Sequence, residues 1–260
     1  MRDPWEGRTA AGLIRTGAAA QRIPEAFRAV LADTAETVSA AAPSSSLYVY
    51  GSVATGQAEI GRSDVDLLGI GLDDDRAQIV SADLSERFAD RCRAVAVGAA
   101  APDDFVGAHD EAYGNRVFLR HYCVLVSGTG AHRPDHDFPA DARAARGFNG
   151  DIVRHRDRWR SELPTTTDVG ALATRIARKS LLALAGLLSV HDGIWTTDRA
   201  MAVTRWSEIE PERAAGLDTL RVWTGGAPTL DRDEIARTLD ELVDPLVDRF
   251  ARDIGLWPEP

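Results

Sequence analysis

The sequence predicts an α+β fold in two parts, with strands and helices mixed over residues 1–138 and helices over residues 139–260. Three observations lead to this prediction. β-prone runs alternate with helical patterns in the first half, whereas the second half is helical almost throughout. The stretch from His132 to Pro139 is rich in proline and aspartate, which is typical of a connection between domains. A length of 260 residues is also sufficient for two modest cores.

The elements of the first half follow from local patterns. Apolar residues at helical spacing predict a helix over 23–38, with Pro24 suited to its first turn, and the proline and serine residues at 41–46 end it. A second helix is expected over 76–91, after an acidic turn. Short β-prone runs predict four strands, at 47–50, 65–72, 94–97 and 117–127.

The second half is expected to consist of helices joined by short connections. Asp231, followed by Glu234 three residues later, is typical of a helix start. The periodic apolar residues place helices at about 140–162, 168–190, 198–207, 209–223 and 231–254.

Composition excludes several classes of protein. The formal net charge is −10, which argues against a protein that binds nucleic acid through a broad basic face. Two cysteines, Cys92 and Cys123, are too few for a disulfide framework or a cysteine-built zinc site. No apolar stretch is long enough to cross a bilayer, and the N-terminus lacks the apolar core of a signal peptide. We therefore expect a soluble cytoplasmic protein without a membrane partner.

The segment from Tyr48 to Leu72 contains the chemistry. A strand ends at Gly51-Ser52, and a short helix and a glycine-containing loop lead to Ser63-Asp64-Val65-Asp66, where a second strand begins. Because side chains alternate along a strand, Asp64 and Asp66 point to the same face. Two carboxylates this close repel each other and need a cation, protons or arginine partners. They suit Mg²⁺, which takes its remaining ligands from phosphates and water.

The Gly51-Ser52 turn adds a second function to the segment. Backbone N–H groups at the start of a helix, together with a hydroxyl, favour a phosphate group. A cation site and a phosphate site are thus expected within one short stretch of chain.

This combination resembles the signature of the DNA polymerase β-like nucleotidyltransferase superfamily, in which Gly-Ser is followed by Asp-x-Asp. The helical half, over Lys179 to Asp192 and on to Ala200, is similar to the streptomycin/spectinomycin-type aminoglycoside adenylyltransferase branch. The resemblance implies a polymerase-β-like domain with a mixed sheet, followed by a C-terminal helical bundle.

The resemblance also implies roles for particular residues. Asp64 and Asp66 would be the catalytic carboxylates and the Mg²⁺ ligands. The nucleoside triphosphate would be held by Gly51 and Ser52, with Ser63 positioning the Asp-x-Asp strand. Lys179, which is the only lysine of the chain, would supply positive charge to the phosphates from the helical domain.

The implied activity is the Mg²⁺-dependent transfer of a nucleoside monophosphate, AMP from ATP, to a hydroxyl of a small molecule. The implied partners are the nucleoside triphosphate and that acceptor. An aminoglycoside-like natural product is the leading acceptor, which would connect the protein with antibiotic resistance. Nucleic acid is not an expected partner.

The sequence departs from the family pattern at one important place. The family usually carries a third carboxylate on a later strand, and the matching stretch 93–98 contains no acid, with Ala94 or Ala96 at the expected position. Asp103 and Asp104 follow beyond Pro102, and a solvated turn is the more natural interpretation of them. The general base therefore stays unassigned. Two alternatives stay open, a catalytically impaired nucleotide-binding relative with a regulatory role and an enzyme that modifies protein or RNA.

The remaining candidates have structural interpretations. His132 and His136 lie four apart, but Pro134 between them argues against a helical zinc site. His121 is expected within a strand, as a core or edge residue. Four tryptophans of the helical half are most simply explained as core residues, Trp159, Trp195, Trp206 and Trp223.

Overall fold

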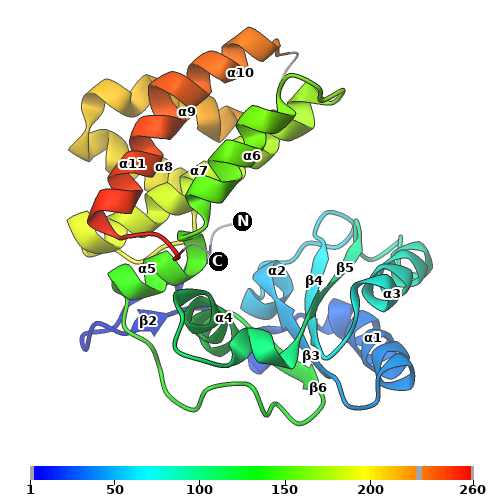
Figure 1. Cartoon of the computed structure of the whole chain (residues 1–260). Coiled ribbons are helices and arrows are strands. Elements are labelled where there is room, and N and C mark those ends of the chain that lie inside the picture. The colour runs from blue at the N-terminus through cyan, green and yellow to red at the C-terminus, as the bar shows by residue number, and fades with distance from the viewer. Residues whose placement is uncertain (1–2, 227–229, 259–260) are drawn as a thin grey trace. The chain divides into compact units, whose positions relative to one another are not determined.

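The computed structural model describes residues 3–226 and 230–258 (Figure 1). The chain forms two compact units. One runs up to Thr9 and from Leu13 to Phe138, and the other comprises Ala10–Gly12 and the chain from Pro139 onward. The first unit combines a sheet with helices, and the second is helical, so the fold is mixed α and β as the sequence predicts.

The sheet of the first unit has four strands in the order β5-β4-β3-β6. The central strand β3 runs antiparallel to β4 and β6, whereas β4 and β5 are parallel, so the sheet is mixed. The strand predictions near residues 47, 65 and 94 are confirmed. The bounds are β3 (Ser46–Tyr50), β4 (Val65–Ile70), β5 (Val95–Ala100) and β6 (Val124–Ser127).

The two faces of this sheet are covered to different extents. Helices α1 (Arg28–Ala41) and α3 (Asp74–Arg87) pack side by side on one face, where the alternate residues of β3, β4 and β5 form a continuous apolar core (Figure 1). The opposite face has a smaller cluster around Tyr48 and Leu119. On that face Asp66 of β4 is only half-buried and Ala96 of β5 is exposed, so this part of the sheet is less covered within its own unit.

The predicted strand over 117–127 is wrong in its first half. The structure forms helix α4 (Asp110–His121) there, and only β6 is extended. Acidic residues begin the helix and Arg120 and His121 end it, which complements the helix dipole. Tyr113, Val117 and His121 are buried at a spacing of four, so tertiary packing outweighs the β propensity of the local run.

The second unit packs its helices around α7 (Val169–His191), whose middle is buried on nearly all sides (Figure 1). The predicted helix over 140–162 is divided near Gly150. The helix predicted over 231–254 is continuous but contains a π-helical turn at Leu239–Val243. Side chains of Asp141, Asp168, Asp198 and Asp231 cap helix N-termini. The remaining bounds are α5 (Ala142–Asn149), α6 (Ile152–Glu162), α8 (Arg199–Ile209), α9 (Ala214–Trp223), α10 (Arg232–Thr238) and α11 (Asp244–Asp253).

Short elements complete the described chain. They are β1 (Gly7–Arg8), β2 (Ile14–Arg15), α2 (Gly51–Thr55) and the 3₁₀ turns Ala20–Arg22, Glu25–Phe27, Pro102–Phe105 and Pro211–Arg213. Among the helices of the described ranges, none combines the length and the apolar character that crossing a membrane requires.

Candidate functional site

The two aspartates lie on one face of the sheet, at the start of β4. Val65 and Leu67 are fully buried on the opposite face, and this anchoring turns Asp64 and Asp66 to the less covered side. Asp66 is paired with Tyr50 in the antiparallel ladder and with Ala96 in the parallel one. The structure therefore brings Asp64 and Asp66 together as the sequence predicts.

The turn after β3 lies directly against Asp66. Gly51 has φ +69°, and a Cβ added there would lie 2.8 Å from Asp66 Oδ2. Glycine is required for both reasons, because the left-handed backbone and the close approach each exclude a side chain. Ser52 follows in α2 and is half-buried. The predicted cation and phosphate residues are thus neighbours in space.

The electrostatics of this face are unfavourable for the protein alone. Burial and then the charge of Asp64 raise the pKa of Asp66, and Arg93 only partly opposes them. Burial and the Asp66 carboxylate likewise raise the pKa of Tyr50 to about 12. Both shifts are due first to burial and second to the neighbouring negative charge.

Arg93, which the sequence did not identify as a site residue, is the ion-pair partner of this face. Its Nε donates to Asp64 Oδ1 at 2.8 Å, and a terminal nitrogen donates to Asp64 Oδ2, so the guanidinium binds the carboxylate through both oxygens. The Arg93 side chain is 69% exposed and that of Asp64 26%. An arginine two residues before the strand that pairs with an Asp-x-Asp strand is the signal that could have revealed this contact.

Ser63 organises the loop before the aspartates. Its hydroxyl accepts a hydrogen bond from the Glu59 backbone N–H at 2.9 Å, and its carbonyl accepts one from the Arg93 N–H at 3.0 Å. Ser63 is buried, and its role in positioning the aspartates stays a prediction.

Lys179 lies in the helical unit on α7. Its ammonium is 2.7 Å from Asp151 Oδ1 and donates to the Phe148 carbonyl at 3.2 Å. The lysine therefore already has two partners within its own unit. A role in phosphate binding stays a prediction for this residue, and it would require these contacts to break.

Strand β5 carries no carboxylate beside Asp66. The register places Ala96 opposite Asp66 on β5. Asp104 instead caps the 3₁₀ turn, where its Oδ2 accepts the Ala101 N–H at 2.8 Å. Among the described residues, no group of three or more histidine, cysteine or acidic side chains is placed to hold a metal ion. Two carboxylates fit Mg²⁺ only when phosphate oxygens and water complete its coordination.

The histidines and cysteines have structural roles. His121 lies at the end of α4 rather than in a strand, and its Nε2 accepts a hydrogen bond from the Phe138 N–H at 2.9 Å. Burial lowers the pKa of His121 to about 4, which suits this neutral acceptor. Both cysteines are buried thiols. His136 contacts Asp135.

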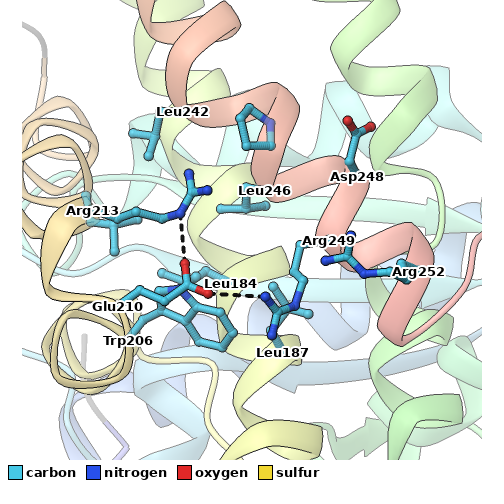
Figure 2. Close-up of a pocket in the computed structure, with 12 residues that line it drawn as sticks. Leu184, Leu187, Trp206, Glu210, Arg213, Leu242, Leu246, Asp248, Arg249 and Arg252 are labelled. Atoms are coloured by element: carbon cyan, nitrogen blue, oxygen red, sulfur yellow. Dashed lines mark hydrogen bonds and ion pairs between the residues drawn. The ribbon is translucent and has the colours of Figure 1, made fainter.

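A pocket of about 270 Å³ lies within the helical unit (Figure 2). Leucines and Trp206 form its apolar lining, and Glu210 lies at its polar side between Arg213 at 2.8 Å and Arg249 at 3.2 Å. Both arginines are thus paired with the Glu210 carboxylate, and neither a histidine nor a cysteine is among the described residues that line the pocket. The four tryptophans that the sequence predicts as core residues, Trp159, Trp195, Trp206 and Trp223, are all buried. The pocket therefore offers less chemistry than the sheet face.

Comparisons with known proteins do not connect the chain with a family. No protein-family model matches it, and no curated protein matches it. The face formed by Asp64, Asp66, Gly51 and Arg93 therefore offers the main indication of function.

Proposed function

We propose that this chain is a Mg²⁺-dependent nucleotidyltransferase that transfers AMP from ATP to a hydroxyl of a small polar molecule. The observation that carries the proposal is the contact between Gly51 and Asp66, because it joins a phosphate-binding turn to a pair of carboxylates. The polymerase-β-like resemblance of the same residues supports it.

The proposed roles follow from the chemistry of the residues. Asp64 and Asp66 would hold the ion, which when bound neutralises phosphate charge and orients the α-phosphate for in-line attack. The absence of a side chain at Gly51 lets the triphosphate approach the backbone closely, and Ser52 can donate its hydroxyl hydrogen to a phosphate oxygen. Two carboxylates side by side repel each other, which favours binding of a cation at this position.

The acceptor class rests on the resemblance to aminoglycoside adenylyltransferases. Such an acceptor is cationic, and a chain with a net charge of −10 is compatible with attracting it. No residue is assigned as the base that takes the proton of the acceptor hydroxyl.

One specific observation favours a second candidate function. Ala96 lies beside Asp66, where the family carries an acid. A nucleotide-binding protein with little or no transfer activity would need only the two aspartates and the phosphate turn. This candidate predicts nucleotide binding without pyrophosphate release.

Calorimetry with ATP and GTP, each with and without Mg²⁺, tests the proposal. We expect Mg²⁺-dependent binding by the native protein and its loss in Asp64→Asn/Asp66→Asn. The matched control is Asp74→Asn/Asp75→Asn, which removes two exposed carboxylates from the start of α3 and should bind normally. Absence of binding by the native protein would contradict both candidate functions. Pyrophosphate release with an aminoglycoside panel then separates the two.

A further inference from the structure

Arg93 occupies the carboxylate oxygens of Asp64 that a metal ion would need. Within residues 3–226 and 230–258, it is the one cationic side chain at ion-pair distance from either Asp64 or Asp66. Its guanidinium contacts both carboxylate oxygens of Asp64. A divalent cation that bound Asp64 would therefore have to displace the guanidinium.

One arginine cannot neutralise two carboxylates. With Asp64 paired to Arg93, Asp66 has no cationic side chain of the described residues at ion-pair distance. Asp66 therefore still attracts a cation, while Arg93 occupies the Asp64 oxygens that would help to bind that cation. A free metal ion has to break the bidentate Arg93–Asp64 pair and leaves the guanidinium without a partner. A metal ion bound to a triphosphate instead offers phosphate oxygens to the guanidinium.

The guanidinium has room to change partners. The Arg93 side chain is 69% exposed, and Ala96 on the neighbouring strand is exposed and presents only a methyl group. The planar fork of arginine matches phosphate as well as carboxylate oxygens. A triphosphate held at the Gly51-Ser52 turn would bring such oxygens to the same face of the sheet.

We propose that Arg93 makes this site selective for a metal–nucleoside triphosphate complex over the free metal ion. Arg93 pairs with Asp64 in the empty site, and it binds phosphate oxygens of the triphosphate when the metal takes Asp64. This inference rests on the nucleotidyl-transfer function proposed above, and it adds Arg93 to the residues that bind the triphosphate.

The test measures two affinities for the full chain and its Arg93→Gln variant. Mn²⁺ titrated alone, followed by electron paramagnetic resonance, reports the free-ion affinity, and calorimetry reports the affinity for ATP with Mg²⁺. We expect Arg93→Gln to bind Mn²⁺ about fivefold more tightly, because the competing cation is gone. We expect the same variant to bind ATP with Mg²⁺ about tenfold more weakly, because a charged phosphate contact is lost.

Two further variants separate this effect from general charge. Arg93→Lys keeps the charge without the fork and should lie between the native protein and Arg93→Gln in both affinities. Arg91→Gln removes an exposed arginine two residues away, which pairs with Asp90, and should match the native protein. Because the Arg93–Asp64 pair is exposed on the arginine side, Arg93→Gln is expected to fold, which circular dichroism checks.

The outcomes distinguish this inference from the proposed function. Native protein that binds ATP with Mg²⁺, together with an Arg93→Gln variant unchanged in either affinity, would overturn the role of Arg93 alone. Native protein that does not bind the nucleotide would overturn the proposed function and this selectivity with it. An Arg93→Gln variant that binds Mn²⁺ more tightly and ATP with Mg²⁺ more weakly supports the inference. An arginine with a purely structural role would not shift the two affinities in opposite directions.

Discussion

Two ion-pair clusters of this protein are built in opposite ways. On the sheet, Arg93 pairs with Asp64 and not with the neighbouring Asp66, whose pKa is raised. In the helical unit, a single carboxylate, Asp151, receives the Lys179 ammonium at 2.7 Å and His155 Nε2 at 2.9 Å.

The pKa of Asp151 is shifted in the opposite direction to that of Asp66. Burial alone would raise it, but the hydrogen bonds and charges of His155 and Lys179 outweigh burial and lower it to about 2. The Asp151 and Lys179 side chains are each 19% exposed, so little solvent screens this pair. A carboxylate with two partners, such as Asp151, stabilises its own fold, whereas Asp66, with no cationic side chain of the described residues at ion-pair distance, leaves charge for a ligand.

The largest expected effect is a loss of stability in the cluster of Asp151, Lys179 and His155. Lys179→Met leaves Asp151 short of a partner in a partly buried place, so we expect the free energy of unfolding to fall by about 2–3 kcal/mol. Urea denaturation measures it. The control Arg175→Met removes an exposed partner of Glu162 and should cost less than about 1 kcal/mol. A stable Lys179→Met variant with weakened ATP affinity would instead support the phosphate role that the sequence predicts.

The second prediction concerns the turn against Asp66. Gly51→Ala places a Cβ 2.8 Å from Asp66 Oδ2 and also adopts φ +69°, so we expect a loss of about 2 kcal/mol in unfolding free energy together with weaker nucleotide binding. Gly61→Ala is the matched control, because Gly61 has φ +72° and no atom within 4 Å of its Cβ position. Equal losses in the two variants, measured by urea denaturation, would show that contact with Asp66 contributes nothing.

The third prediction concerns a third carboxylate added beside Asp64 and Asp66. Ala96→Asp places a third carboxylate beside Asp66 in the ladder, so we expect Mn²⁺ to bind about tenfold more tightly than to the native protein. Gly98→Asp puts the same group beside Leu68 on the same strand and should have a smaller effect. If both variants bound Mn²⁺ equally, proximity to Asp66 would not be the cause.

The smallest expected effect is on the pH dependence of stability, which should have opposite signs for Asp66 and Asp151. The folded-state pKa of Asp66 lies above its ordinary 3.8, so stability falls as pH rises through the interval between the two values. Asp66→Asn should therefore stabilise the protein near neutral pH, by about 0.5 kcal/mol after allowance for solvent screening. The gain should vanish towards pH 3.8.

Asp151→Asn provides the opposite case. Because the pKa of Asp151 is lowered to about 2, its charge stabilises the fold above pH 3.8, and that contribution is lost as pH falls towards 2. Denaturation curves of both variants across this range measure the two signs. Destabilisation of Asp66→Asn at neutral pH would show that Asp66 has a structural partner and is not held for a ligand.

Local pattern accounts for the elements that it predicted correctly. The β-prone run before Gly51 and the apolar run after Asp64 form β3 and β4, because the alternate residues that the pattern selects are those buried against α1 and α3. The pattern failed over 117–127, where the apolar residues suit a strand and a helix equally and packing of α4 decided the outcome.

The sequence by itself determined that Asp64 and Asp66 share a face, because alternation along a strand needs no tertiary information. It also determined that a glycine ends the preceding strand. Only the tertiary structure decided the partners of these residues. The parallel pairing of β4 with β5 brings Arg93 to Asp64 and Ala96 to Asp66, and the packing of α6 and α7 brings Asp151 to Lys179. Strand order and helix packing arise from burial of surfaces far apart in the chain, so no local pattern encodes which charges meet.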